Sequence, residues 1–205
     1  MNTFTKRGEI AGPAGALSVA VDTTTDVPTR GLAVVCHPHP LQGGTMDNKV
    51  VTTIARALTQ RGWRVVRFNY RGVGASAGNW DEGRGEVDDA LAVIAAHRVA
   101  DEPLVLAGFS FGGYVAASAA ARLPQAERPG RMVLVAPSTV RHDAPPVTAE
   151  TLLIHGEADE VVPLSASMDW ARPQALPVVV VPGAGHFFHG QLMLLKALVL
   201  RNFAE

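Results

Sequence analysis

Cysteine is almost absent from this sequence of 205 residues, since Cys36 is the only one. A single cysteine cannot form a disulfide within the chain and fits a reducing compartment, and nothing nearby marks its thiol as reactive. Long apolar runs are missing too: the longest candidate, residues 192–200, is interrupted by Lys196 and is far shorter than the ~20 residues that span a bilayer. The polar N-terminus lacks the apolar core of a signal peptide. We therefore expect a cytoplasmic protein with no membrane partner.

An excess of charge of one sign is also missing, because the formal net charge is -1 and no basic cluster stands out. Nucleic-acid binding is therefore not expected. Hydrophobic residues make up 47% of the chain and charged residues 18%, a balance typical of globular rather than disordered proteins. With no internal repeat, low-complexity segment or linker, the sequence predicts a single domain over residues 1–205.

Short apolar runs rich in Val, Leu and Ile alternate with longer stretches of helical spacing. Continuously apolar strands separated by helices indicate a mostly parallel sheet with helices on both faces. The fold class is therefore α/β, with an antiparallel hairpin at the start. The Pro-rich stretch 137–150 is too short to hold a cap domain. The expected strands are residues 9–11, 17–21, 31–36, 64–69, 104–107, 132–135, 151–154 and 178–181, and the expected helices are 49–61, 86–98, 112–123 and 186–203.

The pattern Gly-x-Ser-x-Gly occurs twice, around Ser76 and around Ser110. A nucleophilic serine on this motif sits in a tight turn between a strand and a helix, and glycines flank it because side chains there would clash. The copy at Ser110 directly follows an apolar strand and runs into an alanine-rich helix. The copy at Ser76 is followed by a loop, which predicts an ordinary flexible loop serine. Ser110 is therefore the predicted nucleophile, against the alternative of a glycine-framed turn with no chemistry.

A serine hydroxyl is a poor nucleophile at neutral pH and needs a general base, usually a histidine held by a carboxylate. After a nucleophile in such a turn, the acid and then the histidine follow along the chain. His186 follows a strand and a glycine loop, which places it at the carboxyl edge of the sheet, where Ser110 also lies. His189, one helical turn further on, is expected at the rim of the site or on the surface. His186 and His189 by themselves would supply only two ligands and lack the third and fourth ligands of a metal site, so no metal is expected.

Three carboxylates follow the strand 151–154 and compete for the role of the acid. Asp159 is far enough past the strand end to turn back toward the histidine loop, and apolar residues follow it. Glu157 and Glu160 are expected to be solvated loop charges. The sequence thus predicts a catalytic triad of Ser110, Asp159 and His186.

With these pieces in place, the chain resembles the alpha/beta-hydrolase superfamily over almost its entire length. The segment 155–163, His-Gly-Glu-Ala-Asp-Glu-Val-Val-Pro, resembles the acid loop of that superfamily, and 183–188, Gly-Ala-Gly-His-Phe-Phe, resembles its histidine loop. The His-Pro-His-Pro stretch at 37–40 and the Asn-Tyr-Arg-Gly-Val-Gly-Ala-Ser loop at 69–76 are similar to motifs of small bacterial hydrolases without a cap. The resemblance implies an alpha/beta-hydrolase fold and a carboxylesterase-like activity.

The negative oxygen of the tetrahedral intermediate needs two preorganised hydrogen-bond donors. One candidate is the backbone amide of Phe111, and the other comes from the loop after the strand 31–36. Proline has no N–H, which leaves His39 or Leu41 in that loop. Similarity to the His-Gly-x loops of the superfamily favours His39. His37 is expected to orient the turn by hydrogen bonds.

The expected reaction is acyl transfer from a small-molecule ester to water, with no metal or organic cofactor. Without a cap, an open and shallow site is expected, with apolar walls that suit short or medium acyl groups. A peptidase or thioesterase on the same triad, and an idle hydrolase fold used as a binding module, are the alternatives. A monomer or a small homo-oligomer is expected. The candidate walls are Leu41, Phe109, Phe111, Phe187 and Phe188.

Overall fold

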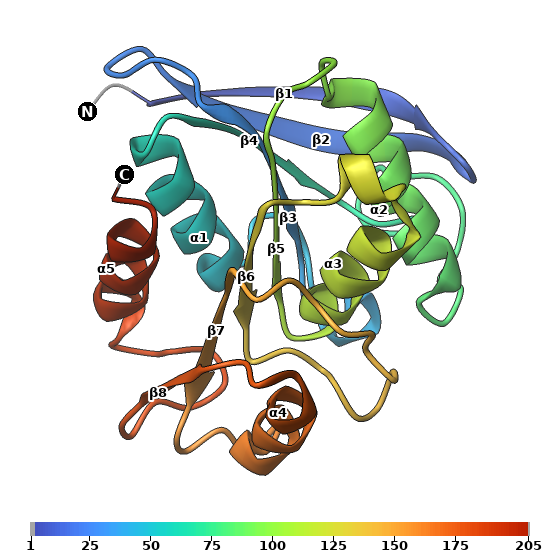
Figure 1. Cartoon of the computed structure of the whole chain (residues 1–205). Coiled ribbons are helices and arrows are strands. Elements are labelled where there is room, and N and C mark those ends of the chain that lie inside the picture. Colours follow the sequence, from blue (N-terminus) through green and yellow to red (C-terminus); the bar gives the residue numbers. More distant parts are fainter. Residues whose placement is uncertain (1–2, 205) are drawn as a thin grey trace.

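A computed structural model describes residues 3–204 of the chain (Figure 1). Eight strands form one sheet in the order β1-β2-β4-β3-β5-β6-β7-β8. The β1–β2 and β2–β4 pairs are antiparallel, and all the other pairs are parallel. This is the mostly parallel sheet with an N-terminal hairpin that the sequence predicts. The strands are β1 (Thr3–Gly12), β2 (Gly15–Thr24), β3 (Gly31–Cys36), β4 (Trp63–Phe68), β5 (Leu104–Phe109), β6 (Arg131–Val135), β7 (Thr151–Gly156) and β8 (Val178–Val181).

Helices cover both faces of the sheet (Figure 1). On one face α1 packs against α5, and on the other α2 packs against α3. The short helix α4 lies beside β7 and β8. The helices are α1 (Lys49–Gln60), α2 (Arg84–His97), α3 (Phe111–Arg122), α4 (Leu164–Ala171) and α5 (Leu192–Asn202), with short 3-10 turns η1 (Pro40–Gln42), η2 (Gln125–Glu127) and η3 (Arg172–Gln174).

The two faces of the sheet carry separate hydrophobic cores, because alternate residues of a strand point to opposite faces. In β3, Ala33 and Val35 join the core under α1 and α5, whereas Leu32 and Val34 join the core under α2 and α3. Every residue of β3, β5 and β7 is buried. The central strands are thus fixed from both sides, and so is the carboxyl edge from which the loops after them emerge.

The ends of several elements differ from the sequence-based expectation. Both strands of the hairpin are longer than expected, and α4 was not expected because only two of its residues, Ser167 and Ala171, are buried. The closing helix begins at Leu192 rather than at residue 186. A helix cannot extend further back, because Phe188 and Gly190 have left-handed φ values of 51° and 74°. His186 therefore lies in a loop.

The segment between β6 and β7, residues 136–150, contains no helix or strand, so no cap covers the carboxyl edge of the sheet. None of the helices within residues 3–204 is long and apolar enough to cross a bilayer.

Candidate active site

Ser110 lies where β5 ends and α3 begins. Its φ of 55° and ψ of -121° are strained for a residue with a side chain, as expected of a nucleophile in a strand-to-helix turn. Glycine is required on both sides of it. A Cβ on Gly108 would overlap the carbonyl group of Gly112, and a Cβ on Gly112 would overlap the carbonyl group of Cys36.

Backbone hydrogen bonds hold this turn in place. The Ser110 amide donates to the Val135 carbonyl at 2.9 Å, and the Ser110 carbonyl accepts from the amides of Gly113 at 2.9 Å and Ser138 at 3.0 Å. Val135 ends β6 and Ser138 belongs to the loop after it, so the neighbouring strand supports the strained serine. The sequence did not single out Ser138.

The structure brings the three candidate triad residues together from the loops after β5, β7 and β8. Ser110 Oγ lies 3.0 Å from His186 Nε2, and His186 Nδ1 lies 2.7 Å from Asp159 Oδ2. All three residues are nearly buried, with exposed fractions of 8% for Ser110, 6% for His186 and 8% for Asp159. The result is an unbroken chain of side-chain hydrogen bonds at the carboxyl edge of the sheet.

The Asp159 carboxylate is held from several sides. Its Oδ1 accepts from the amides of Val161 at 2.9 Å and Val162 at 2.8 Å. Burial by itself would raise the pKa of Asp159, but hydrogen bonds from His155, His186 and the Val162 amide outweigh it and hold that pKa well below its ordinary value of 3.8. Asp159 is therefore ionised at neutral pH.

The ionised carboxylate decides the tautomer of the neutral His186. A carboxylate only accepts hydrogen bonds, so the proton between the two side chains is assigned to His186 Nδ1. The lone pair of His186 Nε2 is then left for the hydroxyl proton of Ser110. This arrangement suits a general base acting on a serine.

A second histidine, His155, lies behind the carboxylate and is fully buried. Its Nδ1 is 2.8 Å from Ser167 Oγ, and its Nε2 is 2.9 Å from the Val162 carbonyl oxygen and 3.4 Å from Asp159 Oδ2. Since a carbonyl oxygen only accepts, Nε2 carries the proton. His155 thus fastens both the acid and the loop that supports it. Its position at the end of β7, just before the acid loop, is the only sequence signal for this contact.

The two candidate oxyanion donors are placed near the serine. The Phe111 amide is the first of α3 and has no acceptor within the helix. His37 Nδ1 lies 2.7 Å from the Pro38 carbonyl oxygen, and in a planar trans peptide the following N–H, that of His39, points the opposite way. The His39 side chain lines the cavity beside the serine, whereas Leu41 is 70% exposed and lies outside it. The placement is compatible with donation by Phe111 and His39.

His37 supports the backbone around this loop, as the sequence suggested. Its Nε2 accepts from the Tyr70 amide at 3.2 Å, and the Tyr70 hydroxyl donates to the His37 carbonyl at 3.2 Å. Burial lowers the pKa of His37 to about 3, against the opposing effect of its hydrogen bond to Pro38. Burial also raises the pKa of the Cys36 thiol to about 12, with a smaller opposing effect from Tyr70. His37 is therefore neutral and Cys36 is an unreactive buried thiol.

Ser76 is not the flexible loop serine that the sequence predicts. It is 6% exposed, its Oγ accepts from the Ser18 amide at 3.0 Å, and its hydroxyl donates to the Asn69 carbonyl at 2.9 Å. Both hydrogen-bonding functions of this hydroxyl are used by the backbone. Ser76 therefore joins β2 to the loop after β4.

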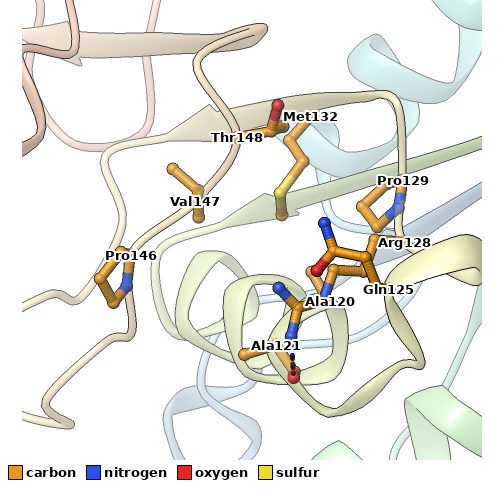
Figure 2. Close-up of a pocket in the computed structure, with 9 residues that line it drawn as sticks. All are labelled: Ala120, Ala121, Gln125, Arg128, Pro129, Met132, Pro146, Val147 and Thr148. Carbon is orange, nitrogen blue, oxygen red and sulfur yellow. Dashed lines mark hydrogen bonds between the residues drawn. The ribbon is translucent and has the colours of Figure 1, made fainter.

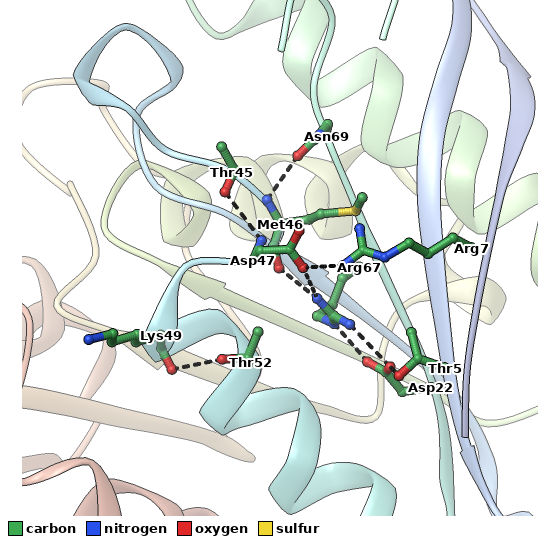
Figure 3. Close-up of polar contacts among 10 residues, drawn as sticks. All are labelled: Thr5, Arg7, Asp22, Thr45, Met46, Asp47, Lys49, Thr52, Arg67 and Asn69. Carbon is green, nitrogen blue, oxygen red and sulfur yellow. Dashed lines mark hydrogen bonds and ion pairs between the residues drawn. The ribbon is translucent and has the colours of Figure 1, made fainter. Parts of the chain in front are cut away.

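A network of ion pairs fixes the segment that follows the His-Pro-His-Pro stretch (Figure 3). Arg67 on β4 is 5% exposed and pairs with Asp22 on β2 at 2.7 Å and with Asp47 at 2.9 Å. Arg67 also donates to the Met46 carbonyl at 2.9 Å, and the Asn69 side chain accepts from the Met46 amide at 2.9 Å. These contacts tie the segment that contains Met46 and Asp47 to the sheet.

A cavity of about 220 Å³ opens beside Ser110. Of the expected substrate-binding residues, none lines it: Leu41 is exposed, Phe109 is fully buried with its ring centroid 4.9 Å from that of His186, and Phe187 lines a neighbouring cavity of about 310 Å³. Most of the residues that line the cavity lie in the loops after β6 and β7. The sequence indicates them only by their position, since both loops begin at the same edge of the sheet as Ser110. Besides Ser110, the lining residues are His39, Gln42, Ser138, Thr139, Val140, Arg141, His142, Val161, Val162, Pro163 and Ala166.

A larger cavity of about 490 Å³ lies at the other end of α3 (Figure 2). Its lining includes Ala121 and Met132, and Arg128 on its wall donates to the Ala121 carbonyl at 3.0 Å. A helix rises about 1.5 Å per residue, so the length of α3 separates this cavity from Ser110 by roughly 15 Å. Cavity size therefore does not locate the candidate chemistry.

Known proteins share this architecture. The crystal structure of an a/b serine hydrolase without lid from Xanthomonas campestris matches with a TM-score of 0.89 and 41% identity, covering 100% of this chain and 95% of that one. An alpha-beta serine hydrolase homologue from Coxiella burnetii matches with a TM-score of 0.87 and 40% identity, covering 96% of each chain. An uncharacterised protein of Rickettsia prowazekii (strain Madrid E) is 31% identical over an alignment of 193 residues, and the match covers 86% of this chain and 79% of that protein.

The family described as serine aminopeptidase, S33, has a sequence model that matches residues 28–147, more than half of the 205 residues. The match begins before β3 and includes the turn that carries Ser110. The chain therefore belongs to this family, within the alpha/beta-hydrolase superfamily, and is a hydrolase.

Proposed function

We propose that this hydrolase is a carboxylesterase that acts on short- to medium-chain esters through an acyl-enzyme on Ser110. The observation that carries the proposal is the chain of hydrogen bonds from Asp159 through His186 to Ser110, with lengths of 2.7 Å and 3.0 Å. Such a chain activates a serine hydroxyl without metal or cofactor.

In the first step His186 Nε2 takes the hydroxyl proton while Ser110 Oγ attacks the ester carbonyl. The amides of Phe111 and His39 receive the developing oxyanion, and each such donor contributes about 10²–10³-fold to the rate. His186 then gives its proton to the leaving alcohol. In the second step it deprotonates water, which attacks the acyl-enzyme, and it then returns that proton to Ser110 Oγ as the ester bond breaks and the acid leaves. Asp159 keeps His186 in the productive tautomer and stabilises its charged form.

The size of the cavity supports small acyl groups. Its volume of about 220 Å³ is below the ~300 Å³ at which drug-sized pockets begin. Its apolar members, among them Val140 and Val162, offer surface to a short chain.

An aminopeptidase is the second candidate, favoured by the description of the family. Holding the ammonium group of a peptide N-terminus calls for an acidic side chain near the nucleophile. The cavity beside Ser110 is lined by Arg141 and by no Asp or Glu of residues 3–204. The positive charge of Arg141 favours esters over peptides with a free, positively charged N-terminus. Thioesters fit the same triad.

A fluorophosphonate probe and a substrate panel test the proposal. We expect the probe to label the wild type and not Ser110→Ala. We expect kcat/KM to be highest for 4-nitrophenyl butyrate to octanoate and far lower for palmitate and for aminoacyl 4-nitroanilides. A folded wild type that resists the probe, or that prefers the anilides, would overturn the proposal.

A further inference from the structure

Arg141 is the only lining residue of the cavity beside Ser110 that carries a full charge at every physiological pH. It lies in the loop after β6 and is exposed. Within residues 3–204, it neither forms an ion pair nor donates a hydrogen bond. Some exposed arginines pair with acids, such as Arg122 with Asp88 at 2.6 Å, and others, such as Arg56, have no partner in that range but lie away from the cavity. Because Arg141 has no carboxylate partner and lies beside the candidate nucleophile, its guanidinium is available to bind a ligand.

The rest of the cavity lining is neutral. Burial first, and the charge of Arg141 second, lower the pKa of His39 from its ordinary value of 6.5. Burial, His39 and Arg141 lower the pKa of His142 in the same way. The acids nearest in sequence to the lining segments, Asp143 and Glu160, do not line the cavity. At neutral pH the lining of the cavity thus carries one positive charge, that of Arg141, and no carboxylate.

The loop that carries this charge is anchored beside Ser110. The ring of His142 packs on Phe111 and on Tyr114, with centroids 5.1 Å apart in both cases. His142 Nδ1 is 3.0 Å from Ser138 Oγ, and the Ser138 amide donates to the Ser110 carbonyl at 3.0 Å. Arg141 therefore lies at a fixed place relative to the serine, although its side chain reaches solvent.

We propose that Arg141 is a specificity-determining residue and that the preferred substrates are esters with an anionic group, a carboxylate or a phosphate, on the part of the substrate that lies in this cavity. The inference rests on the proposed esterase function. A guanidinium presents a planar fork of donors that matches the two oxygens of such a group. Val140 and Val161, which also line the cavity, offer apolar surface to the chain between the ester and the anion.

The test compares two esters of equal chain length, mono-4-nitrophenyl adipate, which carries a carboxylate, and 4-nitrophenyl hexanoate, which does not. We expect wild-type kcat/KM to favour the adipate by about two- to fivefold, the effect of one partly exposed ion pair. Arg141→Gln abolishes that preference and leaves hexanoate hydrolysis within about twofold, and Arg141→Lys retains most of it. Arg141→Glu reverses the preference. The matched control is Arg56→Gln, which removes another exposed arginine without a partner in the described chain, on α1, and changes neither rate.

Salt provides an independent readout, because the preference of the wild type for adipate should shrink as ionic strength rises and that of Arg141→Gln should not change. If the ratio of kcat/KM for adipate to kcat/KM for hexanoate is the same in the wild type and in Arg141→Gln, the inference is overturned. In that case the esterase proposal still stands, provided that Ser110→Ala no longer hydrolyses hexanoate. A wild type that hydrolyses neither ester overturns the esterase proposal and the inference together.

Discussion

Two regions of the molecule each contain a buried serine and a buried histidine, and they use them in opposite ways. At the carboxyl edge, Ser110 and His186 bond to each other at 3.0 Å, and His186 bonds to a carboxylate. In the loops after β3 and β4, Ser76 and His37 bond to backbone groups. Both serines lie in Gly-x-Ser-x-Gly, with similar exposed fractions of 8% and 6%. Motif and burial therefore do not distinguish them, whereas their hydrogen-bond partners do.

Backbone geometry separates the two serines as well. Ser110 has a φ of 55°, and Ser76 is not among the residues of the described chain with positive φ. In the strained turn the Ser110 side chain bonds to the His186 side chain, whereas the Ser76 hydroxyl bonds to main-chain groups. Substitutions in the first region should change chemistry, and those in the second should change stability.

The largest expected effect is that of Ser110→Ala. We expect kcat to fall by about 10³–10⁶-fold, because Ser110 supplies the only hydroxyl that is hydrogen-bonded to His186 within residues 3–204. The free energy of unfolding should change little, since the backbone hydrogen bonds that hold the turn at Ser110 do not involve its side chain. Ester hydrolysis by both Ser110→Ala and Ser76→Ala checks the contrast, and equal losses in the two variants would contradict it.

Asp159→Asn should lower kcat by about 10⁴-fold, because an amide can donate to His186 and favour the wrong tautomer. The measurement is kcat for 4-nitrophenyl butyrate at neutral pH. Glu160→Gln, on an exposed neighbour, is the control. A small effect of Asp159→Asn would mean that the carboxylate is merely structural.

We call the region that contains Ser76 and His37 the structural region. It should contribute to the loss of folding stability as the pH falls. The pKa of His37 is about 3 in the folded chain against 6.5 as its ordinary value, so the unfolded state binds more protons between these values. Stability is full above pH 6.5 and should decline by about 1–2 kcal/mol from pH 7 to pH 5. Asp159, whose pKa is lowered from 3.8, contributes stability that is constant over this window and is lost only at lower pH.

Urea unfolding at pH 7 and pH 5 measures this decline. His39, His97 and His142 also have lowered pKa values and act in the same direction, so the wild type loses stability through all of them. His37→Asn should therefore show a shallower decline than the wild type. An unchanged decline would place the effect outside the structural region.

His155 combines the features of the two regions, because its Nε2 bonds to a backbone carbonyl and also lies 3.4 Å from the Asp159 carboxylate. His155→Gln should lower kcat about tenfold with little change in KM, because the acid is misplaced while the cavity is kept. Saturation kinetics separate the two parameters. A stability loss without any change in kcat would assign His155 to the structural region alone.

The smallest expected effect is that of Ser76→Ala. Removing its two backbone hydrogen bonds should lower the free energy of unfolding by about 1–3 kcal/mol, and the effect on activity should be the smallest of the series. Probe labelling and kcat should stay within about twofold of the wild type. Urea unfolding gives the first quantity, and a loss of activity in the folded variant would break the comparison.

The sequence was sufficient to predict that Ser110, Asp159 and His186 meet, because order along the chain and strand ends place them at one edge of the sheet. It was insufficient for Ser76, whose burial depends on the amide of Ser18, 58 residues away. The lining of the cavity was also beyond reach. Arg141 belongs to a loop without periodicity, and its place depends on the packing of the His142 ring. The start of α5 was missed because the left-handed φ of Phe188 leaves no mark in the sequence.

We propose that Ser110, and not Ser76, is the reactive serine. Peptide mass spectrometry of the folded wild type after treatment with a fluorophosphonate locates the labelled residue. We expect one adduct, on the peptide that contains Ser110, and none in Ser110→Ala. An adduct on the Ser76 peptide, or full labelling of Ser110→Ala, would contradict the proposal.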